Sequence, residues 1–382
     1  MQPIIESHVD DGTMVVRSSY EDVVAYVVNE IDTYKSELAV NWDDFKDREG
    51  RFTLGVALAI KARTLLYAAS PLHNPTNDVK KWEAAAAAAN ELISNTELGY
   101  SLDPSYASYF IGGNPLTSPE TIYCVRRSQS NNMEKNNYPI ATQGGKSGAT
   151  PTHNLVAAYE YIGTPDPTNP YANRDPRLAA SVVTNGSTWN GRTIDQSAGA
   201  IDDMANANAS KTGYYLKKFL TDNLNLVQGQ VAQHNWVAYR WAEVLLNYAE
   251  AMNEAYGPDA APAGYTLTAR QALQQVRDRA SSKLPKVFAS DKESFREVVK
   301  HERRVELAFE DHRYWDLLRW KDAMDVLNKP VLGVAVTKTE TGWSYEVKEV
   351  ATRTFHERNY YLPFLRSEIE NSKNTLEQNP NY

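Results

Sequence analysis

Apolar residues recur every three or four positions along three stretches near the start of the chain, which is the spacing of amphipathic helices. The first stretch follows Ser19, which forms a capping-box pattern with Asp22, and it predicts a helix over 20–38. The other two stretches predict helices over 53–69 and 79–94. Because a short turn with Pro and Asn joins these two helices, we expect them to form a helical hairpin.

The middle of the chain, residues 99–234, lacks this periodicity. Gly, Pro, Asn, Ser and Tyr dominate it, and their clusters mark turns. The pattern predicts only a short helix over 154–161 and short strands over 179–183 and 213–219. So long a stretch without regular elements is unusual in a compact domain, and long loops often carry function.

Helical periodicity returns after residue 234. The pattern predicts helices over 235–256, from Thr268 to before Pro285, over 290–310 and over 313–327, and then strands over 331–336 and 343–347. The loose spacing of similar helix pairs is typical of a tetratricopeptide-like scaffold. The predicted fold class is therefore all-α: tetratricopeptide-like helical pairs with a long loop-rich insertion and a few short strands. We expect one domain over 1–382, with a helical hairpin region (15–98), a loop-rich region (99–234) and a C-terminal helical region (235–382).

Composition excludes several classes of protein. The 40 Lys and Arg residues against 48 Asp and Glu give a net charge of −8, so a general nucleic-acid binder is not expected. The one cysteine, Cys124, excludes an internal disulfide framework and a cysteine-rich zinc site. No zinc-protease histidine pair or glycine-rich phosphate loop is present, so we expect no metal and no cofactor. No apolar run is long enough to span a membrane, and the first residues lack a signal-peptide pattern.

One charged segment offers two interpretations. Arg303 and Glu306 lie three residues apart on a predicted helix, as do Glu310 and Arg313, so each pair can meet and stabilise the helices. The alternative is that Glu302 and Glu306 form the acid–base pair of a glycoside hydrolase. The arginines that follow Glu302 would keep these carboxylates ionised, whereas a general acid needs a raised pKa. The structural interpretation is favoured, and we predict no catalytic residue.

Six segments, taken in order, resemble the SusD/RagB family of outer-membrane nutrient-binding lipoproteins. They run from a segment rich in Leu, Tyr and Ala that ends in Ser-Pro to a terminal Asn-Pro-Asn-Tyr, where the family usually has Gly before its final Tyr. The six segments are 62–74, 173–178, 239–251, 276–280, 302–320 and 376–382. A single motif of this kind is weak, but six in the family's order are specific.

The resemblance implies an all-α fold and a non-enzymatic glycan-binding subunit of an outer-membrane uptake complex. Its expected partners are an oligosaccharide and a SusC-like TonB-dependent transporter. Some branches of the family take peptides instead of glycans, so a peptide ligand is an alternative. The resemblance implies a place on the outer face of the cell outer membrane, held by an N-terminal lipid anchor. Against the family's pattern we expect this chain to lack that anchor and its N-terminal portion, and an intracellular tetratricopeptide-type adaptor is a further alternative.

Aromatic residues on the predicted loops are candidates for sugar binding, because a ring face can stack on the C–H face of a sugar. The candidates are Tyr138, Tyr171 and Trp189, with Asn137 and Asn190 as polar partners for sugar hydroxyl groups. Tyr and Trp combine a flat apolar face with a polar tip, which suits half-wet surfaces. The alternative for each ring is a loop anchor that packs on the helical scaffold.

Overall fold

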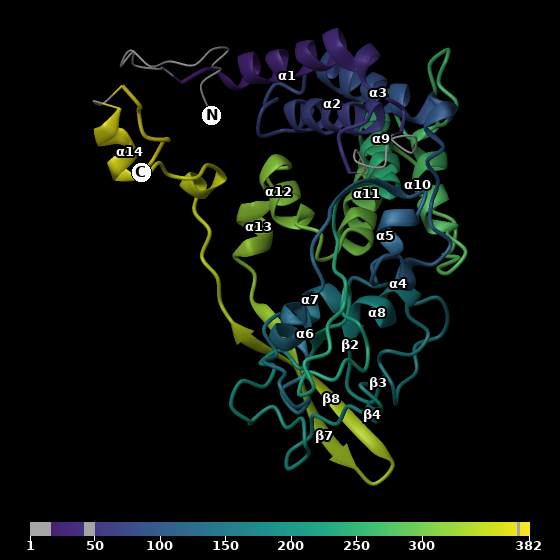
Figure 1. The fold of residues 1–382 in the computed structure, drawn as a ribbon, viewed down its shortest axis with the longest axis vertical. Helices are drawn as coiled ribbons and strands as arrows, with labels where there is room; N and C mark the ends of the chain where they lie inside the picture. Colours follow the sequence, from purple (N-terminus) through teal and green to yellow (C-terminus); the bar gives the residue numbers. More distant parts are fainter. Residues whose placement is uncertain (1–16, 42–49, 373–374) are drawn as a thin grey trace.

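The computed structural model describes residues 17–41, 50–372 and 375–382. Figure 1 shows the long helices gathered at one end of the molecule and the loop-rich region with its short strands at the other. The helix-rich class predicted from the sequence is confirmed. Residues 15–16, the start of the first predicted region, lie outside the described residues.

The helical end contains the longer helices together with the short helix α13. These are α1 (Tyr20–Tyr34), α2 (Leu54–Ala69), α3 (Val79–Ser94), α9 (Trp241–Tyr256), α10 (Ala269–Arg277), α11 (Lys292–Glu306), α12 (His312–Arg319) and α13 (Ala323–Leu327). The expected capping box at Ser19 is present, since Asp22 N–H donates to Ser19 Oγ and Ser19 N–H donates to Asp22. Thr268 and Gln271 form a second one at the start of α10. These local signals place the helix starts correctly because they depend only on neighbouring residues.

Helix α9 is the centre of this frame. All thirteen residues from Ala242 to Glu254 are buried. Its apolar side chains join those of α2, α3, α10 and α11 in the largest core cluster. The alanine-rich face of α3 is buried in this cluster, because its small side chains allow close helix packing. The predicted hairpin of α2 and α3 is therefore one wall of the frame, and α9 lies against it.

The loop-rich end contains short helices and strands of two to five residues. The helices are α4 (Tyr106–Tyr109), α5 (Asn114–Thr117), α6 (Asn132–Asn137), α7 (His153–Val156) and α8 (Pro176–Ser181), and the strands are β1 (Thr121–Val125), β2 (Val182–Val183), β3 (Thr188–Trp189), β4 (Arg192–Thr193) and β5 (Tyr215–Leu216). The strands predicted over 179–183 and 213–219 do pair, but only as β2 and β5. Residues 176–181 form helix α8 instead, because Asp175 caps it and Pro176 occupies its first turn. The helix predicted over 154–161 is only the single turn of α7.

Several predicted helix boundaries are wrong. Helix α1 ends at Tyr34 and α10 at Arg277, each short of its predicted end. The chain is extended over β6 (Trp236–Arg240), which pairs antiparallel with β1, before α9 begins. Helix α11 ends at Glu306, and Phe309 and Asp311 then adopt positive φ angles. The predicted helix over 313–327 divides into α12 and α13 around Lys321, which also has a positive φ angle. At the end of β6 and after the end of α11 lie Arg240 and Glu310, whose side chains form a buried ion pair.

The two C-terminal strands are longer than predicted and form one hairpin, β7 (Val331–Thr339) and β8 (Gly342–Ala351). The hairpin runs along the loop-rich end (Figure 1) and packs on its core through Val334 and Val336. Val334 N–H donates to the carbonyl oxygen of Thr212 at 2.9 Å. The chain then leads to α14 (Arg366–Asn371). Among the helices of the described residues, none has the length and hydrophobicity needed to cross a membrane.

Candidate functional site

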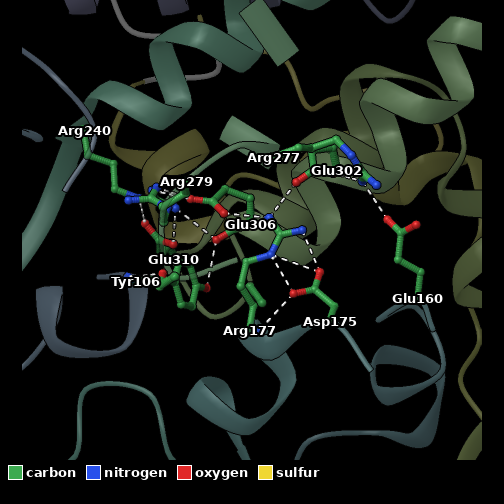
Figure 2. Close-up of polar contacts among 12 residues, drawn as sticks. Tyr106, Glu160, Asp175, Arg177, Arg240, Arg277, Arg279, Glu302, Glu306 and Glu310 are labelled. Carbon is green, nitrogen blue, oxygen red and sulfur yellow. Dashed lines mark hydrogen bonds and ion pairs between the residues drawn. The ribbon is translucent and has the colours of Figure 1, made fainter. Parts of the chain in front are cut away.

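A buried network of opposite charges lies where the helical frame meets the loop-rich end (Figure 2). Five cationic and five anionic side chains take part, and each is almost completely inaccessible to solvent. They are Arg177, Lys218, Arg240, Arg277 and Arg279, with Glu120, Asp175, Glu302, Glu306 and Glu310. Figure 2 also shows the half-buried Glu160, which contacts Arg277 at 2.6 Å.

Glu306 is the centre of the network. Its carboxylate accepts hydrogen bonds from Arg177 at 2.7 Å and from Arg240 and Arg279 at 2.8 Å each. Glu302 lies one turn earlier and accepts from Arg177 at 2.5 Å and from Arg277 at 2.8 Å. Both carboxylates have 0% exposed surface. Neither can reach a substrate in this structure, which argues against the acid–base pair considered from the sequence.

The network joins segments that are far apart in the chain. Glu120, Asp175, Arg177 and Lys218 come from the loop-rich region, and the other members come from the helical region. Glu310 accepts from Arg240 Nε and from Lys218 Nζ, each at 2.7 Å. Removing one partner of a buried ion pair leaves an uncompensated charge, so these contacts fix the loop-rich end on the frame.

Electrostatics in the network favour ionised carboxylates. Burial alone would raise the pKa of Glu306, but Arg279, Arg240 and Arg177 together hold it well below its usual range. Burial lowers the pKa of Lys218 to about 8, although Glu310 opposes this shift. A general acid needs the opposite shift of a carboxyl pKa. Glu306 and Glu310 are therefore held ionised near neutral pH.

The two ion pairs predicted within the charged segment do not form. Arg303 binds Asp316 at 3.0 Å and Asn247 at 2.6 Å, while Glu306 turns to the arginines of other segments. Glu310 and Arg313 do not share a helix, because α11 ends at Glu306 and α12 begins at His312. Burial lowers the pKa of Arg313 to about 10, and no carboxylate of the described residues forms an ion pair with it. The charged side chains of this motif thus contact other partners than the ones predicted.

Acid should unfold this protein, and the pKa shifts give the pH range. Burial would raise the pKa of Glu243 and of Asp316, but their arginine partners lower each to about 2. A carboxyl group with a depressed folded-state pKa adds stability above its unfolded pKa of about 4, and this stability is lost as the pH falls below that value. We expect the thermal midpoint to decline from pH 7 to 5, because burial lowers the pKa of His73 to about 4 and also lowers those of His153, His301 and His312. It should then fall more steeply between pH 4.5 and 2, where the carboxyl groups are protonated. Calorimetry across this pH range tests the expected loss of stability. Equal thermal midpoints at pH 7 and pH 3 would contradict it.

The structure does not support a stacking role for Tyr138 or Trp189. Their rings are 0% and 2% exposed and pack edge to face in the core of the loop-rich end. The Tyr138 hydroxyl donates to the carbonyl oxygen of Thr221 and accepts from Leu224 N–H at 3.2 Å. Both rings therefore act as loop anchors, which was the alternative considered for them.

The other three predicted residues are nearer the surface. Tyr171 is half-buried and lies edge-on against Tyr345, with ring centres 5.3 Å apart. Asn137 uses its amide within its own loop, donating to Met133 O at 2.8 Å and accepting from Ala149 N–H at 3.0 Å. Asn190 likewise bonds to Thr142 and Asn223. The structure thus brings Tyr138, Asn137 and the Trp189–Asn190 segment into one loop core, while Tyr171 lies apart, beside the β7–β8 hairpin.

Several important residues were not identified from the sequence. Arg177, Arg240, Arg277 and Arg279 occur in the segments that carry the family resemblance, but no spacing rule shows that they converge on Glu302 and Glu306. The aromatic pair Trp343 and Tyr345 was also missed as a candidate site. Their alternation on β8 was the available signal, since residues two apart on a strand face the same side. Within the described residues, no three His, Cys, Asp or Glu side chains gather as a metal site.

Together these features define a helix-rich scaffold that holds long loops at one end through buried charge. Comparison with known proteins identifies the family. The model of the SusD family matches residues 119–382. This chain therefore belongs to the SusD family.

SusD-like protein P38 of Formosa agariphila is 23% identical over 341 residues, which are 85% of this chain and 62% of P38. The chain thus spans less than two thirds of the length of that relative.

Solved structures agree with this assignment. A SusD-like protein of Bacteroides fragilis matches with a TM-score of 0.81 and 26% identity, covering 98% of this chain and 74% of the other. A SusD-like carbohydrate binding protein of the same species matches with a TM-score of 0.78 and 25% identity, covering 97% and 74%. The arrangement of frame and loops is thus that of the SusD-like fold.

Proposed function

We propose that this chain is a non-enzymatic glycan-binding subunit of an outer-membrane uptake complex. The observation that carries the proposal is its likeness, over 97% of its length, to a structure described as a SusD-like carbohydrate binding protein. We further propose a SusC-like TonB-dependent transporter as its partner and the outer face of the outer membrane as its place. The carboxylates Glu302 and Glu306 are buried and held by arginines, which argues against a role for them as a catalytic acid–base pair.

Affinity electrophoresis tests the binding role. The purified chain is run through native gels that each contain one polysaccharide, with serum albumin as a non-binding control. We expect retardation by at least one glycan, and no new reducing ends after prolonged incubation with it. Binding to peptides without retardation by any glycan would favour the peptide-binding branch of the family. Release of shorter sugars would show an enzyme and contradict the proposal.

A further inference from the structure

A cleft of about 640 Å³ lies between the turn end of the β7–β8 hairpin and two loops, 167–170 and 185–186. This volume is within the range of small-molecule sites. Its wall is made of Pro, Gly, Thr, Ser and Asn residues together with Trp343 and Tyr345. None of the lining side chains is charged. The cleft therefore offers aromatic surface and neutral hydrogen-bonding groups, and no formal charge.

Trp343 is held in place from two sides. Its indole N–H donates to Asp195 Oδ1 at 3.0 Å, and Lys338 Nζ donates to the other oxygen of the same carboxylate at 3.0 Å. Gly186 approaches the ring so closely that an added Cβ would lie 3.3 Å from its Cζ3 atom. The ring is thus oriented before any ligand arrives, which lowers the entropy that binding would lose.

Tyr345 lies two residues from Trp343 on β8, so the two side chains face the same side of the hairpin. The Tyr345 hydroxyl accepts from Asn185 Nδ2 at 3.2 Å, and Asn185 Oδ1 accepts from Gln196 N–H at 2.8 Å. The rings of Tyr171 and Tyr345 pack edge to face, which helps to hold Tyr345 in place. Two rings spaced along one strand, about 7 Å apart by strand geometry, match the surface of a short extended ligand better than a single buried ring would.

The absence of charged side chains on the cleft lining indicates which class of sugar it fits. Lys338, on β7, forms an ion pair with Asp195 at 3.0 Å. A uronic acid or a sulfated sugar would lose water from its anionic group and find no cation on the cleft lining to compensate. A neutral sugar needs only the amide and hydroxyl groups that the cleft provides, directly or through water.

We propose that this cleft is a binding subsite for a neutral oligosaccharide, with Trp343 as the stacking platform and Tyr345 as the second ring. The inference rests on the proposed glycan-binding function and adds its location and the class of sugar. The loop residues Thr168 and Asn169 complete the polar wall opposite the hairpin.

Isothermal titration calorimetry on the full chain tests this subsite. Neutral, uronic-acid and sulfated oligosaccharides are titrated into the native protein and into Trp343→Ala, Trp343→Phe and Trp315→Ala. Trp315 is the matched control, because it is 45% exposed on α12, outside the cleft. Circular dichroism and thermal melting check that each variant is folded.

We expect Trp343→Ala to weaken neutral-sugar binding about ten-fold or more, since aromatic anchors carry much of the energy of small contact areas. Trp343→Phe should recover part of the loss, and Trp315→Ala should bind as the native protein does.

Three results would overturn part of this account, and they are distinguishable. Binding of a neutral glycan with equal affinity by the native protein and Trp343→Ala would place the site elsewhere and leave the proposed function intact. Binding of acidic or sulfated sugars alone would contradict the assigned sugar class. Absence of binding to every glycan by the folded native chain would reject the proposed function together with the subsite.

Discussion

Replacing Glu306 by alanine is expected to lower the free energy of unfolding by about 3–5 kcal/mol, the cost of breaking a buried ion pair. Its carboxylate accepts hydrogen bonds from Arg177, Arg240 and Arg279, and no solvent reaches the site. Without Glu306 the three guanidinium groups remain buried with less compensating charge. Urea denaturation at pH 7, followed by circular dichroism, measures the loss as a lower midpoint.

Two further variants separate charge from packing. Glu306→Gln keeps most of the side-chain volume, so a large loss in this variant reports the missing charge and not a cavity. Glu297→Ala is the matched control on the same helix, because its side chain is 72% exposed and makes one loose contact of 3.4 Å with Lys300. We expect that control to change stability by no more than about 0.5 kcal/mol. Equal losses in Glu306→Ala and Glu297→Ala would show that the network adds nothing to stability.

The sequence predicted the helices well because their signals are local. Ser19 and Asp22 determine one helix start, and Thr268 and Gln271 another, through contacts within one turn. The same locality explains the wrong start of α9. Trp236 and Arg240 fit a helical stripe, but β1 offers residues 236–240 a partner strand from more than a hundred positions away. The spacing of apolar residues reports the local preference of a segment. It does not report pairing with a strand that is distant in the sequence.

The partners of the charged groups could not be predicted from the sequence for a related reason. A spacing of three allows Arg303 and Glu306 to meet, but it does not exclude better partners elsewhere. Arg177 lies 129 positions from Glu306 and still binds it at 2.7 Å. The candidate ligand residues show the same limit. Trp189 lies in a segment of turn-forming residues that predicts exposure, yet the loop core covers it almost completely. Only Tyr171 was placed beside the cleft proposed here.

Gly213→Ala is expected to lower the free energy of unfolding by about 2–5 kcal/mol, combining backbone strain and overpacking. Gly213 has a φ angle of +79°, a conformation that costs a residue with a Cβ about 1–2 kcal/mol. An added Cβ would also lie 2.7 Å from the carbonyl oxygen of Val334 on β7. Because that neighbour is backbone, the hairpin itself must shift. Thermal and urea denaturation measure the loss of stability.

Gly264→Ala is the control that separates backbone strain from crowding between residue 213 and strand β7. Gly264 has a similar φ angle of +87°, but no atom lies within 4 Å of an added Cβ. Backbone strain is therefore common to both variants, and the difference between them measures crowding at the hairpin, about 1–3 kcal/mol. Since the hairpin carries Trp343 and Tyr345, Gly213→Ala should also weaken glycan binding, while Gly264→Ala should leave it unchanged. If both variants lost the same stability and bound glycan equally, the close docking of β7 on residue 213 would have no role in shaping the cleft.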